Sequence, residues 1–432
     1  MSGHDQSRCR IPWANRRTVL AGGASLLANP SIAASPGPSL FVPGYNAKEA
    51  IFDGMNAARH PTIGRAVPAS YDGPVTLLSK IDLQTGKAQH AAYPVQGHFV
   101  AISADLKIGV LHAQSRDWCV AFDPESLDMI TTSRPFREHR TGGGHAEFVR
   151  NSSILLTAER SAYGAYLGAP ELHHGRIAVR DPQTLQELSQ ISSHGIGPHD
   201  ITLLEDGNTL VVANYGTTQP HICRQQASIG IEPCISFIEL DSGKLLDKIV
   251  VDDLSQQIRH LAASKQDRVM AIMVRQGTIG ELEDALNPLN AGVEADLTAR
   301  GDCAYLPAPM LSVSMQQRGV PAELIEAGNM ALMRQGLTIL HDPLHDQFIA
   351  SYPSTHHILV MDGKTGQITK QFDTRSQGLK YPCGVSLFPG GDTYAVAGSF
   401  GNIRVYETGT HRHLVEQDIN IILYRHSHIT IA

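Results

Sequence analysis

The sequence predicts an all-β fold built from a repeated unit of short strands, and three observations lead to that prediction. The 432 residues include 39 glycines and 24 prolines, which favours many short strands joined by turns. A histidine opens a short apolar strand again and again, as in Gly97-His98-Phe99-Val100, and a polar turn and a second apolar strand follow each time. These openings recur about every 45 to 60 residues, close to the length of a four-stranded propeller blade. We therefore predict a seven-bladed β-propeller.

The first strands of seven units can be placed along the chain. They begin at His98, His145, His199, His260, near Gly336–Leu340, at Cys383 and at His428. Third strands end in turns marked by Asp or Gly, such as Asp82–Lys87 and Asp362–Gly366. The last unit has only its first strand at the C-terminus, so Val75–Lys87 and the strand after it are expected to supply its outer strands. The N- and C-terminal strands would then close one blade and remove a free sheet edge.

Two stretches do not follow the repeat. Residues 35–74 form an N-terminal lead segment ahead of the propeller, which is expected to span 75–432. Residues 277–336 interrupt the fifth unit and contain the helix-prone Glu281–Leu286 and Ala322–Arg334. We expect this stretch to be a partly helical insertion that runs over one face of the propeller.

Residues 1–34 have the pattern of a twin-arginine signal peptide. Arg16 and Arg17 precede the weakly apolar Ala21–Ala28, and small residues follow around Ser31–Ser35. No later stretch approaches the roughly 18 apolar residues that a membrane-spanning helix needs. The sequence therefore predicts export of a folded protein to the periplasm.

Charge and cysteine content limit the possible partners and disulfides. The formal net charge is -7, and the chain has no basic run with interleaved aromatic residues, which argues against a nucleic-acid partner. Six cysteines are present, and Cys9 would leave with the signal peptide. Cys223 and Cys234 are the plausible disulfide in an oxidising compartment, and the odd number left requires at least one free thiol.

The recurring histidine is the strongest functional signal. The first strand of each blade lines the central channel of a propeller, so equivalent residues form a ring around the axis. Imidazole nitrogen and thiolate sulfur are ligands that copper, zinc and iron prefer. The candidate metal ligands are His98, His145, His199, His260 and His428, with Cys383 and His194 as additions. Asp200 and Glu147, close to two of these histidines, are candidate hydrogen-bond acceptors that fix the imidazole tautomer, or direct oxygen ligands.

Structural explanations stand beside this one. In WD-repeat propellers a recurrent Gly-His makes hydrogen bonds within the blade and touches no metal, although this chain lacks the Trp-Asp partner. His173-His174 and His356-His357 precede third strands and are expected to be turn residues. Glu159-Arg160 could face the channel mouth, and a surface ion pair is the simpler interpretation. A buried, inert cysteine is likewise the usual fate of a residue such as Cys383.

The same segments resemble a bacterial family of Tat-exported periplasmic propellers that is catalogued only as a domain of unknown function. The resemblance rests on Ser193–His199, Leu210–Asn214, Gly97-His98, Gly144-His145, Thr157–Glu159, Gly175–Val179, Ile258–Ala262, Cys383–Val385 and His428. Members are often encoded beside imelysin-type and di-haem proteins of iron-uptake clusters, so the resemblance implies the compartment, the fold and a connection to iron, but no reaction. Where the family usually has Gly-His-Gly and His-Glu, this chain has His145-Ala146 and His199-Asp200. A looser similarity is to the propeller of nitrous oxide reductase, whose blade histidines hold copper.

These observations favour a periplasmic propeller that binds iron or copper at an axial histidine ring. Its expected role is in iron acquisition or metal redox handling, with other periplasmic iron-uptake proteins as partners. Two alternatives remain open. A lactonase-like hydrolase would use a metal-bound water, although such a site would be richer in carboxylate and amide oxygens. A metal-free scaffold would bind a partner protein through its broad face.

Overall fold

The computed structural model describes most of the chain outside the N-terminal region. The described residues are 37–44, 73–114, 119–133, 140–161, 174–217, 231–264, 268–286, 303–314, 322–423 and 425–432. The expected signal peptide, 1–34, lies outside them, and so do His173 and Cys223. None of the helices in these ranges is both long and apolar enough to cross a bilayer.

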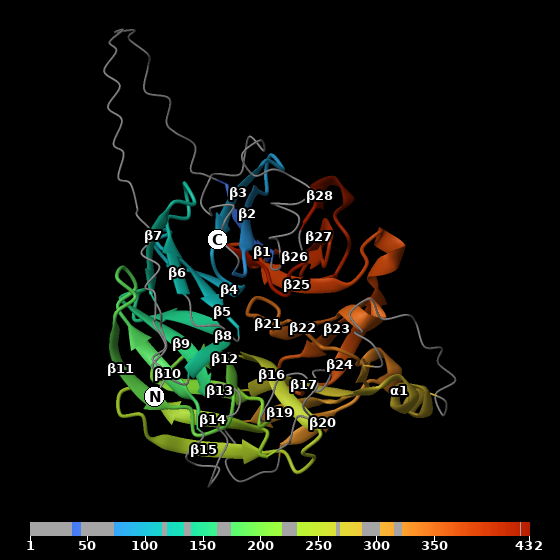
Figure 1. The fold of residues 1–432 in the computed structure, drawn as a ribbon. Helices are drawn as coiled ribbons and strands as arrows, with labels where there is room; N and C mark the ends of the chain where they lie inside the picture. The colour runs from blue at the N-terminus through green and yellow to red at the C-terminus, as the bar shows by residue number, and fades with distance from the viewer. Residues whose placement is uncertain are drawn as a thin grey trace, which may run out of the picture. The chain divides into compact units, whose positions relative to one another are not determined.

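The described residues form seven antiparallel sheets, which confirms an all-β, propeller-like fold (Figure 1). Six sheets have four strands and one has five. The first three sheets are β29 (Thr430–Ile431), β1 (Ser39–Gly44), β2 (Thr76–Asp82), β3 (Ala88–Tyr93); β4 (Gly97–Ile102), β5 (Gly109–Ala113), β6 (Cys119–Phe122), β7 (Met129–Ser133); and β8 (Arg140–Val149), β9 (Ile154–Ser161), β10 (Arg176–Arg180), β11 (Glu187–Ser192). The fourth and fifth are β12 (Pro198–Leu203), β13 (Thr209–Asn214), β14 (Cys234–Glu239), β15 (Leu245–Val250); and β16 (Gln256–Ala263), β17 (Arg268–Thr278), β19 (Met310–Ser314), β20 (Glu323–Ile325), with β18 (Cys303–Leu306) on β17. The last two are β21 (Ile339–Asp342), β22 (Gln347–Tyr352), β23 (His357–Asp362), β24 (Ile368–Asp373); and β25 (Pro382–Leu387), β26 (Thr393–Gly398), β27 (Gly401–Glu407), β28 (Ile419–Ile422).

The hydrophobic core is divided into clusters between neighbouring sheets. Val211 and Phe237 of the β12–β15 sheet, for example, pack against Val269 and Leu311 of the next sheet. Similar clusters join each sheet to the one that follows it in sequence. A further cluster joins the β25–β28 sheet to the sheet that contains β1. Burial between sheets leaves their inner edges to line a central space, which positions the candidate site.

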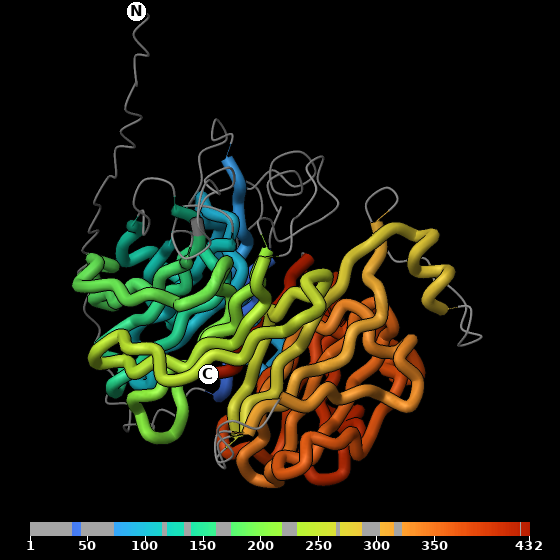
Figure 2. The backbone as a smooth tube through the Cα atoms, turned by 90° about the horizontal axis from the view of Figure 1, so that it is seen from below, coloured from blue at the N-terminus to red at the C-terminus, as the bar shows by residue number. Residues whose placement is uncertain are grey.

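The two ends of the described chain share one sheet. Strand β29 pairs with β1 through Phe41–Thr430 and Leu40–Ile431, and β1 pairs in turn with β2 (Figures 1 and 2). The predicted pairing of N- and C-terminal strands is therefore present. The detail differs, because β1 comes from the expected lead segment and separates the C-terminal strand from β2. The sequence pattern of Ser39–Gly44 did not indicate a strand, because the stretch contains Pro43 and Gly44.

The fifth sheet differs more from expectation. Strands β19 and β20 lie within the expected insertion and complete the sheet of β16 and β17. Residues Glu281–Leu286 do belong to helix α1 (Ile279–Leu286), which packs on β17 and β18 at the edge of the sheets (Figures 1 and 2). The helix expected over Ala322–Arg334 is wrong. That stretch holds β20 and the 3₁₀ turn η5 (Met330–Leu332), because pairing with β19 overrides its helical propensity.

The inner strands of neighbouring sheets are joined by polar bonds between a side chain and a strand edge. These bonds join Glu147 to Leu203 N–H, Asp200 to Leu261 N–H, Thr338 to the Cys383 carbonyl, Ser386 to Ile431 N–H, and Thr430 to the Val100 carbonyl. The inner edge of a sheet has unpaired backbone groups that need partners when they are buried. These contacts satisfy such groups and fix one inner strand against the next.

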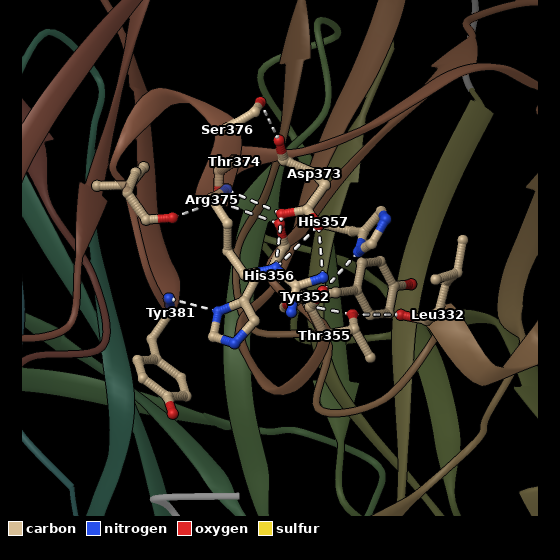
Figure 3. A network of polar contacts seen from close by, with 11 residues as sticks. Leu332, Tyr352, Thr355, His356, His357, Asp373, Thr374, Arg375, Ser376 and Tyr381 are labelled. Atoms are coloured by element: carbon tan, nitrogen blue, oxygen red, sulfur yellow. Dashed lines mark hydrogen bonds and ion pairs between the residues drawn. The ribbon is translucent and has the colours of Figure 1, made fainter. Parts of the chain in front are cut away.

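Three further 3₁₀ turns complete the described elements. They are η6 (Pro353–Thr355), η7 (Thr374–Gln377) and η8 (Val415–Gln417). The first two frame a network of polar contacts around the ends of β22, β23 and β24, which reaches Tyr381 just before β25 (Figure 3).

Candidate metal centre

Five of the seven predicted ligands converge in the structure. The imidazole rings of His98, His145, His199, His260 and His428 lie 4.7 to 5.4 Å apart in the contacts between them. Two overlapping triads, His98–His145–His199 and His145–His260–His428, each place ligand atoms within 4.8 Å of one another. All five side chains are buried, with exposures of 7% or less. Residues up to 330 positions apart in sequence thus form one histidine cluster.

Backbone bulges aim the side chains of the cluster. In five sheets the register between the first two strands shifts at the ring position. His98 and His199 are the extra residues of their bulges. A bulge releases one residue from ladder pairing and redirects its side chain. In β16 the extra residue is Arg259, so His260 stays paired with Ile272 while Arg259 is the side chain that is redirected.

Asp200 orients His145 and lies beside His260. Its Oδ1 lies 3.0 Å from Nδ1 of His145, and its Oδ2 lies 3.7 Å from Nδ1 of His260. The carboxylate also accepts bonds from the backbone N–H groups of Ile201 and Leu261. A carboxylate that accepts from Nδ1–H fixes the imidazole tautomer and leaves Nε2 with its lone pair. Among the described residues, no hydrogen-bond partner reaches Nε2 of His145, which is buried.

A backbone carbonyl in the Gly142–Gly144 run fixes the tautomer of His199, as Asp200 does for His145. Nδ1 of His199 donates to the carbonyl of Gly143, so its Nε2 also carries a lone pair. Gly144 has φ +125°, and a Cβ there would lie 2.5 Å from the His199 ring and 3.0 Å from the His98 ring. The close approach of β8 to the cluster therefore requires glycine at this position.

Thr338 fixes the fifth histidine. Its hydroxyl donates to the carbonyl of Cys383 at 2.8 Å and so accepts from Nδ1–H of His428 at 3.1 Å. Nε2 of His428 therefore has a lone pair, and it lies 3.1 Å from Nε2 of His98. Three of the five rings thus present Nε2 as an acceptor.

Burial favours the neutral form of four of the five rings. It lowers the pKa values of His98, His199 and His428 well below their usual value, and neighbouring imidazoles lower them further. Burial also lowers the pKa of His260 to about 4, although Asp200 acts in the opposite direction. Burial acts to raise the pKa of Asp200, but His145 and His260 hold it below the usual range, so the carboxylate stays charged. Neutral imidazoles are the form that binds metal ions.

A cavity of about 550 Å³ opens onto one side of the cluster. His145, His260, His428 and Asp200 line its inner end. Its walls come from residues that follow the ring positions along β12, β16, β21, β25 and β29, and its lining includes Glu205 and His341. The described residues that line it include no lysine or arginine. A small ligand or a cation could reach the histidines by this route.

The remaining candidates lie outside the two triads. Cys383 occupies the ring position of β25 as the extra residue of its bulge, but its described role is to accept from Thr338 through the carbonyl. Burial raises the pKa of its thiol to about 11. His194 donates from Nε2 to the Gly243 carbonyl, away from the cluster. Oε1 of Glu147 accepts from Leu203 N–H, and burial raises its pKa to about 8.

Two smaller expectations are wrong. Glu159 is not part of a surface ion pair with Arg160; it is buried and pairs with Arg180 at 2.6 Å, because Glu159 and Arg180 lie on paired strands. Cys234 is a free thiol buried in β14, so the Cys223–Cys234 bridge is absent. Cys303 is disulfide-bonded instead.

Sequence reasoning missed several supporting residues. Phe99 stacks on the His145 ring at 4.6 Å, and Tyr215 packs on the His199 ring at 4.7 Å. Thr338 and Gly143 orient rings through Nδ1. The glycine run before His145 and the threonine at the fifth ring position were signals that could have identified two of them.

Comparisons with known proteins show a similarity of fold alone. No curated protein matches the chain. Hydrazine synthase of Kuenenia stuttgartiensis matches with 14% identity and a TM-score of 0.55, over 78% of this chain and 92% of that one. A protein described as "a putative 6-phosphogluconolactonase" from Bacteroides uniformis matches with 13% identity and a TM-score of 0.54, over 92% and 100% of the two chains. Its counterpart from Bacteroides fragilis has 14% identity, a TM-score of 0.53 and coverage of 94% and 100%.

One family model matches part of the sequence. Residues 91–303 match the model described as "Protein of unknown function (DUF1513)". The matched stretch contains four of the five clustered histidines, and His428 lies beyond it. The chain is thus similar, over the half that carries most of the cluster, to a family of unknown function.

Proposed function

We propose that the protein binds a transition metal ion, iron or copper, at the histidine cluster of a closed seven-bladed propeller. The observation that carries the proposal is the convergence of five buried imidazoles, three of which have Nδ1 engaged so that Nε2 is left as a ligand. The buried Nε2 of His145, which belongs to both triads, lacks a partner among the described residues. An unpartnered buried nitrogen is costly unless a ligand satisfies it.

The spacing of the rings supports one ion. Two nitrogens bound side by side to an ion at metal–nitrogen distances of about 2.0–2.1 Å lie roughly 3 Å apart. Nε2 of His98 and Nε2 of His428, which belong to different triads, are 3.1 Å apart and share a hydrogen bond that an ion between them would replace. Imidazole ligands suit copper, iron and zinc, and the triads contain no thiolate or carboxylate. The resemblance to a family of iron-uptake clusters favours iron, and the all-nitrogen set is equally suited to copper.

A lactonase-like hydrolase is less well supported. The similarity to proteins described as lactonases is at 13% to 14% identity and concerns the fold. Hydrolysis through a metal-bound water would be favoured by carboxylate and amide oxygens around the ion, whereas the triads are entirely histidine. The scaffold alternative provides no reason for burying five imidazoles against one another.

Export to the periplasm remains part of the proposal. Arg16-Arg17 and the short apolar segment after them fit a twin-arginine signal. A disulfide at Cys303 is in keeping with an oxidising compartment. We place the metal site in iron acquisition or metal redox handling there, with periplasmic iron-uptake proteins as partners.

The test is metal analysis of the purified protein after equilibration with Fe²⁺, Cu²⁺ and Zn²⁺ in turn. We expect one ion per chain and an X-ray absorption spectrum dominated by imidazole nitrogen. His145→Ala should lower bound metal the most, because His145 belongs to both triads. Metal binding that is absent in the wild type, or unchanged in folded His145→Ala, would contradict the proposal.

A further inference from the structure

The cavity beside the histidine cluster is lined by all three members of only one triad. Those members are His145, His260 and His428. His98 and His199, which complete the other triad, do not line it. An ion held by the triad at the cavity therefore has imidazole nitrogens on the protein side and the cavity on the other. Three protein ligands leave a coordination position open, as in metal sites that take a further ligand.

The cavity is large enough for an organic molecule, and its walls are mostly apolar. Its volume of about 550 Å³ lies within the range of small-molecule sites, roughly 300–1,000 Å³. More than half of the lining residues are apolar, among them Leu203, Leu261, Ile339, Leu340 and Leu387. Such walls favour a ligand that buries carbon surface against them.

Three hydroxyl groups in the lining are used to join the inner strands. Ser386 accepts from Ile431 N–H, and Thr430 donates to the Val100 carbonyl. The hydroxyl of Thr338 both donates and accepts within the protein. These groups are committed to the fold, so the ion itself is the main polar feature that a ligand would meet.

The charged groups of the cavity favour an uncharged ligand. Oδ1 of Asp200 faces His145 and Ile201 N–H, and Oδ2 accepts from Leu261 N–H, so the protein already engages this carboxylate. Glu205 is exposed at the other end of the lining. An anion would meet both carboxylates, and the described lining has no lysine or arginine to offset them. A cation would be repelled by the ion itself.

From these observations we propose that the cavity binds a small, uncharged and largely apolar molecule that ligates the ion through one nitrogen or oxygen atom. The inference rests on the proposed function and specifies the kind of ligand that its metal site receives. Phe99, which stacks on the His145 ring at 4.6 Å, also lines the cavity and offers an aromatic contact to such a molecule. The donor atom gives attachment to the ion, and the apolar walls give selectivity.

The experiment compares three probes that share one pyridine ring: pyridine, 4-phenylpyridine and isonicotinate. Each is titrated at pH 8 and constant ionic strength into the protein loaded with Cu²⁺, and the visible absorption and paramagnetic resonance of the ion report binding. 4-Phenylpyridine should bind at least about tenfold more tightly than pyridine, because its phenyl group is buried against the walls. Isonicotinate, with a carboxylate in place of the phenyl group, should bind no more tightly than pyridine. A triamine complex of Cu²⁺, which has no walls, gives the baseline for each probe.

Two variants narrow the cavity without replacing a clustered histidine. Thr202 and Ala263 are half-buried lining residues, so Thr202→Phe and Ala263→Leu each fill part of the space. Each should lower the affinity for 4-phenylpyridine roughly fivefold or more and leave that for pyridine within about twofold. The matched control is Thr131→Phe, because Thr131 is half-buried on the outer strand β7 and lies outside the lining. It should change neither affinity.

Three results overturn the inference. The first is a wild type in which pyridine and 4-phenylpyridine differ no more than they do on the triamine complex. The second is tighter binding of isonicotinate than of 4-phenylpyridine. The third is a phenyl preference that persists in the folded Thr202→Phe and Ala263→Leu variants. If one variant does not fold, the other decides, and the wild-type probe series against the triamine baseline decides if both fail.

A metal-free arm separates this inference from the proposed function. A ligand that binds only the folded state raises its thermal midpoint. 4-Phenylpyridine should raise the midpoint of the metal-free wild type more than pyridine does, and Thr202→Phe should reduce that difference. This result in a protein that never binds metal would refute the metal proposal and keep the apolar ligand cavity. A protein that binds metal without any phenyl preference would keep the metal site and refute the apolar ligand.

Discussion

Two parts of the molecule bury histidines, and they use them in opposite ways. In the histidine cluster, five rings from five sheets face one another. In the segment around His356 and His357, each ring is occupied by nearby backbone (Figure 3). Nδ1 of His356 accepts from Tyr381 N–H at 2.9 Å, and Nδ1 of His357 donates to the Thr355 carbonyl. His356 is as buried as the clustered rings, at 5% exposure.

The comparison shows that burial alone does not identify a ligand. His356 adopts φ +60° at the end of η6, where its ring helps to join that turn to the segment before β25. Its role is to satisfy backbone groups that would otherwise be unpaired. In the cluster the backbone and carboxylate contacts use Nδ1, and the second nitrogen is left facing other imidazoles. The direction of that second nitrogen distinguishes the two regions.

The largest expected effect is a loss of metal affinity, which a substitution in the histidine cluster should cause and one at His356 should not. His145→Ala should weaken metal binding at least 100-fold, because it removes the ring that belongs to both triads. His356→Ala should leave metal affinity unchanged and instead lower the free energy of unfolding by about 1–3 kcal/mol, since Tyr381 N–H loses its acceptor. Metal titration followed by urea unfolding of both variants measures the two effects. An equal loss of metal affinity in the two variants would show that the two regions do not differ in metal binding.

The sequence was sufficient for the repeat and for the ring. Regular spacing of histidine-led strands predicted within one residue where β4 and β12 begin, because blade length and strand patterning are local properties. Strands β8 and β16 begin earlier than expected, at Arg140 and Gln256, and contain their histidines. The convergence of the five histidines was expected from the rotational symmetry of a propeller. What the sequence could not provide were the contacts that cross between sheets, such as Thr338 with His428 and Asp200 with His260. These depend on the exact position of one sheet against the next.

The errors have similar physical causes. Strands β19 and β20 were hidden because long segments separate them from the regular repeat, and helical propensity in Ala322–Arg334 suggested the wrong element. The predicted Cys223–Cys234 bridge relied on proximity in sequence, whereas Cys234 lies within a paired strand. Cys383 was placed correctly on the ring by its strand position. Its separation from the two triads could not be read from that position alone.

A second prediction concerns Asp200, the carboxylate that orients His145. Asp200→Asn should weaken metal binding roughly 10- to 100-fold, the usual cost of losing a carboxylate behind a ligating histidine. The matched control is Asp418→Asn, because Asp418 accepts from Nε2 of His413 at 2.8 Å well outside the triads. Isothermal titration with the metal compares the two variants. If both lose affinity equally, Asp200 does not act through the histidines.

The third prediction uses acidity to distinguish the cluster from ordinary histidines. Metal affinity should change little between pH 7 and pH 5.5, because His98, His199, His260 and His428 are already neutral and need not release protons. A site of histidines with ordinary pKa values near 6.5 would weaken clearly over that range. Competition titrations at the two pH values measure the difference, and a steep loss of affinity at pH 5.5 would contradict the buried neutral cluster.

The same pKa shifts make a prediction about the metal-free protein. A histidine whose pKa falls on folding binds fewer protons in the native state, so its stabilising contribution is present above pH 6.5 and is lost as the pH falls. For His260 the window extends from 6.5 down to about 4. Glu147 and Glu159 act in the opposite sense, because their pKa values rise to about 8 and about 7 on folding. The four clustered histidines outnumber these two carboxyl groups, and the pKa values of His112 and His411 also fall, to about 3 and about 4. Urea unfolding should therefore show lower stability at pH 4.5 than at pH 7, and equal stability would count against the shifts.

The smallest expected effect tests the ring position that is not histidine. Cys383→Ala should change metal affinity by less than about twofold, because its thiol is protonated at neutral pH and lies outside both triads. Its carbonyl, which accepts from Thr338, remains in the variant. Thr338→Val supplies the contrast: it removes the hydroxyl that fixes Nδ1 of His428, and a several-fold loss of affinity is expected. If Cys383→Ala weakens binding more than Thr338→Val does, the thiol is a ligand and the cluster includes a sixth sheet.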